Sequence, residues 1–112
     1  MALVSRNVDL DVLARVGLAL ADQNRRRILL ALIDGSAYPS DLADHLGLTR
    51  ANVSNHLACL RGCGLVIAQP EGRRVRYELV DRRLGRALRD LLGLVLVLDR
   101  AACPAAVDDE CC

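Results

Sequence analysis

The feature that most constrains this chain is the stretch TRANVSNHLACLRGCGLV, residues 49–66, which predicts one amphipathic helix. Thr49 is a typical N-cap residue, and Gly62 and Gly64 weaken and end the last turn. An apolar stripe recurs at i, i+4 and i+7, formed by Val53, Leu57 and Leu60. At ~100° per residue, a different flank carries Asn52, His56, Cys59 and Cys63. The stripe and the short polar groups are typical of a recognition helix, and the two thiols indicate a sensor.

The segments around this helix predict a winged helix-turn-helix, a fold that is mainly α with a β-hairpin wing. Helices are expected at residues 8–22, 23–34 and 41–46, the last one capped by Ser40 and ended by Gly47. Two short helices joined by a tight turn with glycine are the pattern of a helix-turn-helix. A hairpin follows, with strands at residues 65–68 and 74–80 and a turn at residues 70–72. A last helix is expected at residues 81–99.

The second half of that last helix is apolar nearly all round, with the run LLGLVLVL at residues 91–98. This run is far shorter than the roughly 18 to 20 residues that a membrane span needs. A surface helix of this kind needs a cover, and the simplest cover is a second copy of the chain. The sequence therefore predicts a homodimer and no membrane partner.

The length of 112 residues fits one domain, which we place at residues 1–100, followed by a flexible cysteine-containing tail at residues 101–112. Charged residues interrupt the N-terminal segment, so no secretory signal is predicted and the expected location is cytoplasmic. The sequence shows neither a convergent acid, base and nucleophile set nor a glycine-rich phosphate loop. We therefore expect neither an enzyme nor a small organic substrate.

The case for nucleic acid is local, because the net charge is only +1 and the two tyrosines provide no stacking platform for single strands. Short or forked donors gather at the N-terminal end of the helix at residues 49–66, where a helix can enter a major groove of double-stranded DNA. The hairpin adds a basic tip. The predicted DNA contacts are Thr49, Arg50, Asn52, Ser54, Asn55, His56, Arg73, Arg74 and Arg76. The alternatives are an ordinary charged hairpin and a dimerisation module without DNA binding. Arg25, Arg26 and Arg27 are interpreted as solvated surface charges, with Arg25 near Asp22.

The thiols at positions i and i+4 suit a soft metal ion. Cβ atoms at this spacing lie about 5 to 6 Å apart on one helix face, so one ion can bridge Cys59 and Cys63. Three thiolates suit Cd(II), Pb(II) or As(III) better than Zn(II), which usually completes a tetrahedron. Two alternatives stay open: Cys59 as a small buried hydrophobe, and a thiol redox regulator in which the pair is oxidised. His56 is a further potential ligand on the same flank.

With these elements in order, the chain resembles the ArsR/SmtB family of metal-sensing repressors over roughly residues 8–99. The resemblance is carried by GLALADQNRRRILLALIDG at residues 17–35, by DLADHLGLTRANVSNHLACLRGCGLV at residues 41–66, and by EGRRVRYEL at residues 71–79. It implies a winged-helix homodimer that binds operator DNA without metal and leaves it when metal binds.

The resemblance also limits the choice of metal site. The family's cysteine pair on the helix before the recognition helix is absent, since residues 40–46 contain no Cys. Its zinc site on the last helix needs an Asp and a His, and here Asp81 is followed by Arg83 at the histidine's place. What remains is similar to the family's actinobacterial cadmium and lead sensors, which use two recognition-helix cysteines and one tail cysteine.

Cys59, Cys63 and Cys103 match those three positions, which implies Cd(II) or Pb(II) as effector, with As(III) or Zn(II) as alternatives. The tail would reach the recognition helix of the partner subunit if the last helix forms the dimer interface. Cys111 and Cys112 are additional to the pattern, and a repressor that senses arsenite through this C-terminal pair is a further alternative.

Overall fold

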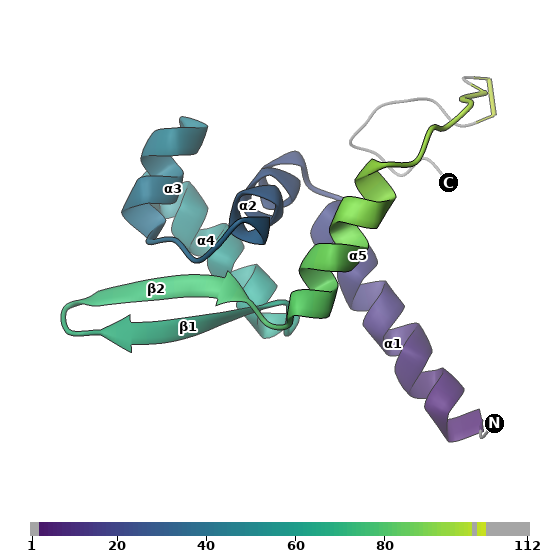
Figure 1. The fold of residues 1–112 in the computed structure, drawn as a ribbon, viewed down its shortest axis with the longest axis horizontal. Helices are drawn as coiled ribbons and strands as arrows, with labels where there is room; N and C mark the ends of the chain where they lie inside the picture. Colours follow the sequence, from purple (N-terminus) through teal and green to yellow (C-terminus); the bar gives the residue numbers. More distant parts are fainter. Residues whose placement is uncertain (1–2, 100, 103–112) are drawn as a thin grey trace.

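The computed structural model describes residues 3–99, 101 and 102. Its element order is α1 (Leu3–Leu20), α2 (Gln23–Ile33), α3 (Pro39–Leu46), α4 (Arg50–Gly62), β1 (Val66–Glu71), β2 (Arg74–Leu79) and α5 (Arg82–Leu92) (Figure 1). The two strands pair as an antiparallel hairpin. The predicted fold, mainly α with a hairpin wing next to a helix-turn-helix, is confirmed.

The core lies around α2, which contacts α1, α3, α4, α5 and β2. Ile28, Leu29 and Leu32 of α2 are buried against the apolar stripe of α4. That stripe is as predicted, and its members are exposed by at most 1%: Val53, Leu57 and Leu60. The packing of α4 on α2 therefore fixes which face of the recognition helix remains available to solvent.

The first helix of the helix-turn-helix, α3, begins two residues earlier than expected. The prediction that Ser40 caps α3 is wrong, because the helix begins at Pro39 and Tyr38 is its N-cap, without a side-chain cap hydrogen bond. Pro39 suits the first helical position, where the missing N–H costs nothing. Gly47 ends the helix at φ +69°, as expected. The Thr49 hydroxyl then accepts a hydrogen bond from the Asn52 backbone N–H at 3.0 Å, which confirms the predicted N-cap of α4.

The hairpin is longer than predicted. The first strand continues to Glu71, so the expected turn at residues 70–72 is wrong, and the connection lies at Gly72 and Arg73. Pro70 pairs with Val75 inside the ladder. A proline is tolerated there because each strand of an isolated hairpin is an edge strand with one open side. The two strands therefore stay paired almost to the tip of the wing.

The outer helices differ from their predicted ranges. α1 begins at Leu3 and ends at Leu20, and α5 ends at Leu92, so the helix expected to run to residue 99 is too long. The Gly93 N–H closes α5 on the carbonyls of Arg89 and Asp90, at 3.2 and 3.1 Å. Residues 94–98 beyond it are exposed, and a short apolar run with nothing packed on it has little reason to stay helical.

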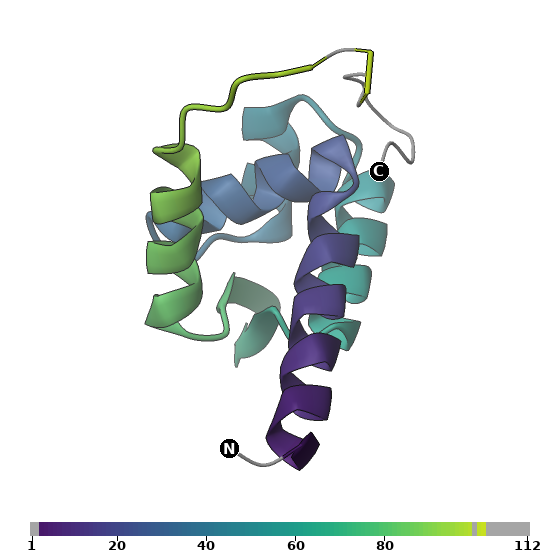
Figure 2. The same ribbon diagram turned by 90° about the vertical axis from the view of Figure 1, so that its right-hand side faces the viewer.

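Exposed apolar side chains gather on α1 and α5, on the side of the molecule away from the hairpin tip (Figure 1). Figure 2 faces this side, with α1 and α5 in front and α2 crossing behind them. A shallow apolar groove there is lined by Leu20, Leu29, Leu30, Leu88, Leu91 and Leu92. Among the helices of the described residues, none has both the length and the apolar character required to cross a membrane.

Candidate nucleic-acid interface and thiol pair

The outward face of α4 is open to solvent near its N-terminal end. Arg50, Ser54 and Asn55 are exposed, and no hydrogen bond or ion pair within the described part of the chain involves their side chains. Thr49 is also exposed, although its hydroxyl is used by the cap. These side chains are free donors and acceptors at a helix N-terminus, an arrangement suited to phosphates and base edges.

Two other predicted DNA contacts lie on the inward flank. The Asn52 side chain is partly buried, and its Oδ1 has no hydrogen-bond partner in the described structure. The His56 side chain is only 18% exposed, and its Nε2 lies 3.7 Å from Oδ2 of Asp22, the residue that precedes α2. The flank that Asn52 and His56 share therefore faces the protein, and their part in DNA contact stays a prediction.

Asp22 connects this flank to α2. It is the N-cap of α2, and its Oδ2 accepts a hydrogen bond from the Arg25 backbone N–H at 3.0 Å. That hydrogen bond is the main reason why the pKa of Asp22 is lowered; partial burial opposes the shift, and the nearby His56 adds to it. The carboxylate thus stabilises the start of α2 and lies against the recognition helix at the same time.

The predicted proximity of Arg25 to Asp22 is confirmed. The interpretation of the three arginines as solvated surface charges is wrong, because each guanidinium has backbone partners. Arg25 donates through Nε to the Ala19 carbonyl at 3.2 Å and through a terminal nitrogen to the Leu18 carbonyl at 2.7 Å. Arg26 likewise donates to Leu20 and Arg27 to Leu46. Each guanidinium satisfies carbonyls that a helix end leaves unpaired. The sequence signal was three arginines near the start of α2, where the helix dipole disfavours cations unless they have other partners.

Cys59 and Cys63 lie in the last turn of α4, both with free thiols and both half-buried. The Cys63 backbone N–H donates to the Cys59 carbonyl at 3.0 Å, so the spacing of one helical turn is maintained up to Cys63. Gly64, at φ +84°, closes the helix through hydrogen bonds from Gly64 to Arg61 and from Leu65 to Leu60. This double closure is a Schellman motif, and it sets the backbone at Cys63.

The Cys63 end of the thiol flank lies at the edge of the core. Cys63 packs against the core cluster, and its charge when ionised contributes to the raised pKa of Arg15, whose main cause is the hydrogen bond from Arg15 to Asp11. The Arg15 Nε lies 2.9 Å from Oδ2 of Asp11. Cys63 is thus held at the edge of the core by the packing of α4.

The third sulfur predicted for this site lies outside the described residues. Cys103, Cys111 and Cys112 are all in the undescribed part of the tail. Within residues 3–99, 101 and 102, no group of three or more His, Cys, Asp or Glu side chains is arranged to hold a metal ion. Two of the three proposed ligands are thus placed, and the third stays a prediction.

The Asp81 carboxylate caps α5 and binds Arg83. It is the N-cap of α5, and Arg83 bonds to it through the backbone N–H at 2.7 Å and through the guanidinium to both carboxylate oxygens. These bonds lower the pKa of Asp81 to about 2. Arg83, at the position where the family's zinc site needs a histidine, therefore occupies the carboxylate that such a site would use.

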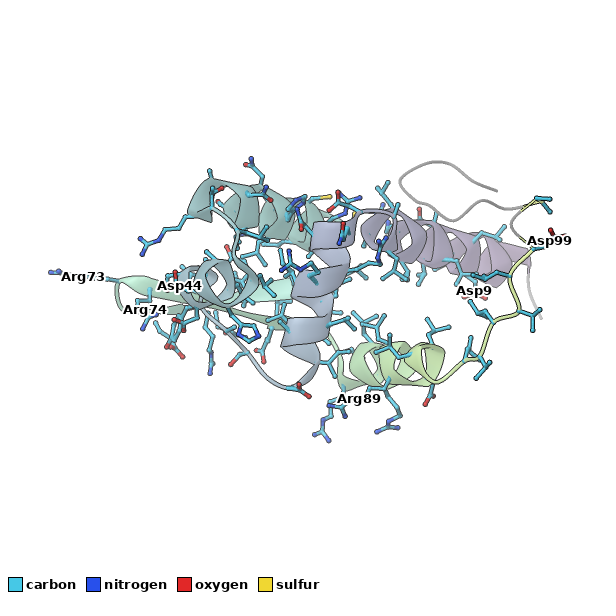
Figure 3. The ribbon with its side chains drawn as sticks, turned by 90° about the horizontal axis from the view of Figure 1, so that it is seen from above. Asp9, Asp44, Arg73, Arg74, Arg89 and Asp99 are labelled. Atoms are coloured by element: carbon cyan, nitrogen blue, oxygen red, sulfur yellow. The ribbon has the colours of Figure 1, made fainter. Side chains whose placement is uncertain are left out.

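The three wing arginines differ in their surroundings. Arg73 points outward from the hairpin tip (Figure 3), and no hydrogen bond or ion pair of the described residues involves it. The Arg74 guanidinium lies 3.5 Å from the centroid of the Tyr38 ring, and Arg76 Nε lies 3.2 Å from Oε2 of Glu71. Tyr38 was not among the residues predicted from the sequence.

A family model described as "Bacterial regulatory protein, arsR family" matches residues 22–68, which span α2 to β1. The HTH-type transcriptional regulator CmtR of Mycobacterium tuberculosis is 66% identical over 87 residues, which are 78% of this chain and 74% of that protein. The chain belongs to the ArsR family. The predicted family, fold and class of protein, a DNA-binding transcriptional regulator and not an enzyme, are confirmed by these relatives.

Solved structures of the ArsR family agree with the described fold. The NMR structure of the cadmium metal-sensor CmtR from M. tuberculosis is 58% identical, with a TM-score of 0.66, and covers 88% of this chain and 96% of that chain. A homodimeric winged helix-turn-helix DNA-binding domain from Mycobacterium bovis, a possible ArsR-family regulator, is 34% identical with a TM-score of 0.70. It covers 78% of this chain and 82% of that domain.

Proposed function

We propose that this ArsR-family regulator is a repressor released by a soft metal ion. In this proposal a homodimer without metal binds operator DNA, and Cd(II) or Pb(II) bound by Cys59, Cys63 and Cys103 weakens that binding. The observation that carries the proposal is the pair of free, half-buried thiols one turn apart on the recognition helix itself. The similarity to the cadmium metal-sensor CmtR supports the choice of metal.

The donor set of the described residues fits such an ion. Two thiolates on one face of a helix offer soft ligands without backbone distortion, because the Schellman motif at Gly64 already sets the end of the helix. A third thiolate from Cys103 gives a three-sulfur site, which favours a large soft ion over Zn(II). In this scheme residues 1–100 bind DNA and dimerise, and residues 101–112 supply the third ligand.

The proposed dimer uses the apolar surface of α1 and α5. Leu13, Leu18, Leu91 and Leu92 are more than half exposed in the single chain, which is unusual for neighbouring large apolar residues on two helices. The homodimeric relative from M. bovis supports a second copy as the cover. A dimer doubles the DNA contacts and predicts an operator with two-fold symmetry.

The proposed coupling follows from where the thiols lie. The outward face of α4 would read DNA, while its inward flank, which carries the thiols, packs against the core at Cys63 and lies beside the start of α2 at His56. A ligand on the inward flank therefore alters the tilt or mobility of the same helix that enters the groove. Coupling of about 1 to 3 kcal/mol, or 5- to 150-fold in DNA affinity, is common for regulators.

The deciding experiment measures operator binding of the reduced protein with and without Cd(II), Pb(II), As(III) and Zn(II). Wild type is compared with Cys59→Ser, Cys63→Ser and Cys103→Ser. We expect all four proteins to bind DNA equally without metal, and only wild type to release it with Cd(II) or Pb(II). Thiolate-to-metal absorption, followed in the same titrations, should fall in each variant. Release that persists in both Cys59→Ser and Cys63→Ser would refute the proposal.

A chain truncated after Val107 is the matched control, since it lacks Cys111 and Cys112 and keeps Cys103. We expect it to respond as wild type does. Loss of the response in the truncated chain would transfer the third ligand to the C-terminal pair and favour an arsenite sensor. Release by an oxidant without any metal would indicate a redox regulator instead, although a disulfide between residues i and i+4 of a continuous helix has poor geometry.

A further inference from the structure

We infer that Tyr38 positions the wing: its side chain holds the hairpin, through Arg74 and Glu71, at a set angle to the helix-turn-helix, and Arg74 is part of this clamp and not a contact to DNA phosphate. The inference rests on the proposed DNA binding by the wing. It adds a positioning residue and changes the role of one predicted DNA contact.

The first observation is where Tyr38 stands in the chain. It occupies the N-cap position of α3, where Ser, Thr, Asp or Asn would accept a hydrogen bond from the first turn. A tyrosine cannot cap in this way, and no side-chain cap hydrogen bond forms. Its ring and hydroxyl are directed to the hairpin instead, so this position is used for a contact between elements at the expense of a local cap.

The second observation is the set of contacts that the ring and the hydroxyl make. The Tyr38 hydroxyl donates to Oε1 of Glu71, and the Arg74 guanidinium lies over the ring, 3.5 Å from its centroid. Arg74 and Glu71 are opposite each other in the hairpin register. The Tyr38 side chain therefore contacts β1 and β2 at the same point, just before the tip. The two strands are held against α3 together.

The neighbouring charges complete the clamp. Oε2 of Glu71 lies 3.2 Å from Nε of Arg76, and a terminal nitrogen of Arg74 lies 3.9 Å from Oδ2 of Asp41 on α3. Each ion pair is at least one-third exposed and contributes little alone. Together with the Arg74 guanidinium over the Tyr38 ring, these ion pairs hold the hairpin against the start of α3.

The base of the hairpin is held separately. Ala37, next to Tyr38, forms an isolated bridge with Tyr77, in which the two backbone N–H groups donate reciprocally at 2.9 and 2.8 Å. The hairpin is thus attached to the α2–α3 connection at two points, at the bridge and at the Tyr38 ring. Two points of attachment restrict rotation of the wing, whereas the bridge alone would act as a hinge.

Arg73 provides the contrast. It has no partner within the described residues and extends from the tip (Figure 3), as expected for a side chain that is free to bind a DNA phosphate. Arg74 already has an aromatic face and a carboxylate as partners, and to reach DNA it would have to give up both. The two adjacent arginines therefore have different tasks.

The test uses the full-length reduced protein and a duplex selected by wild type from a random-sequence pool. Operator affinity is measured as a function of salt concentration, because each phosphate contact adds about 0.9 to the slope of log affinity against log salt. We expect Arg73→Ala to lower the slope by about 0.9 per wing. Arg74→Ala should leave the slope unchanged and still weaken binding, by roughly 5- to 100-fold for two wings that are no longer held in place.

Tyr38→Ala should weaken binding as Arg74→Ala does, and Tyr38→Phe should restore most of the affinity, because phenylalanine keeps the ring under Arg74 and loses only the bond to Glu71. The double variant Tyr38→Ala/Arg74→Ala should be no weaker than either single variant. A slope for Arg74→Ala that falls as far as that for Arg73→Ala would overturn the inference.

A readout without DNA separates this inference from the proposed function. Amide hydrogen exchange of Arg76, which pairs with Gln69 between the bridge and the tip of the hairpin, is compared with that of Leu60, a core residue of α4, in the free protein. Tyr38→Ala should speed exchange at Arg76 relative to Leu60, because strands without the clamp separate more often near the tip, and Tyr38→Phe should do so less. An unchanged ratio would refute the clamp even if DNA binds; a changed ratio in a protein that selects no duplex would leave the clamp standing and refute operator binding.

Discussion

On α4, the outward and inward faces differ in how much of their polar chemistry the protein itself uses. Arg50, Ser54 and Asn55 on the outward face have no partner within the described residues, whereas His56 on the inward flank lies against Asp22. Cys59 is half-buried on the same inward flank. The outward face therefore remains available to an external ligand, and the inward flank connects the helix to the start of α2.

This difference explains how one short helix can serve both a DNA site and an effector site. The two sites use different side chains on neighbouring faces of one helix, while the buried stripe occupies the third face. They remain coupled, because any shift of the inward flank moves the outward face with it. The substitutions below test this division, and each one is paired with a control on the other side or at the other end of the helix.

The largest effect is expected for Leu57→Ala in the core-facing stripe. Leu57 is 1% exposed, and removal of a fully buried leucine side chain costs about 2 to 5 kcal/mol in the free energy of unfolding. Ser54→Ala on the outward face should change that free energy by less than about 0.5 kcal/mol. Urea unfolding at one fixed protein concentration measures both. Equal costs would show that α4 has no distinct inner and outer face.

The next effect concerns DNA alone. Arg50→Ala should lower operator affinity by about 1 to 3 kcal/mol without a change in the free energy of unfolding, because Arg50 is exposed and unpaired in the described structure. Arg61→Ala is the control, since Arg61 is also an exposed arginine of α4 but lies at its other end. Fluorescence anisotropy with a labelled duplex gives both affinities. If Arg61→Ala weakens binding as much as Arg50→Ala, the N-terminal end of α4 is not the reading end.

The division also shows which features the sequence could predict. The stripe, the Thr49 cap and the end of α4 near Gly62 depend on residues within one or two turns of each other, so periodicity and residue type were sufficient. The end of α5 was wrong, because an apolar run indicates a need for cover but not the backbone conformation of an uncovered segment. Ser40 was predicted as the cap of α3 from its residue type. Tyr38 occupies the N-cap position instead, and its side chain contacts the hairpin, which is distant in sequence.

The candidate site was predictable to the same extent. The spacing of Cys59 and Cys63 was visible in the sequence, and the structure places both thiols in one turn. That His56 lies beside Asp22, and that Arg25 holds the end of α1, depends on how α1, α2 and α4 meet. Such contacts join residues with no common periodicity, so a pattern along the chain contains no signal for the partner.

A smaller effect tests the backbone that sets the position of Cys63. Gly64 is at φ +84° with open space around an added Cβ, so Gly64→Ala should cost about 1 to 2 kcal/mol through backbone strain alone. Gly62→Ala is the control: Gly62 also has open space and lies within the helix, where alanine is favoured by up to about 1 kcal/mol. Opposite signs in thermal or urea unfolding confirm the Schellman closure. A destabilising Gly62→Ala would contradict the helical assignment up to that residue.

The smallest effect tests the link between the inward flank and α2. Asp22→Ala removes the N-cap of α2 and should cost about 1 kcal/mol in the free energy of unfolding at pH 7. The pKa of Asp22 is lowered in the folded protein, so its charge-dependent stabilisation is fully present above the pKa of the unfolded chain. It is lost as the pH falls through the folded pKa, and the difference from wild type should therefore begin to shrink below about pH 4. Asp22→Asn retains a good cap without the charge, so its smaller deficit at pH 7 isolates the contribution of the carboxylate toward His56 and Arg25. A deficit for Asp22→Asn that stays constant from pH 7 to pH 3 would show that the negative charge has no part in holding α2 against the recognition helix.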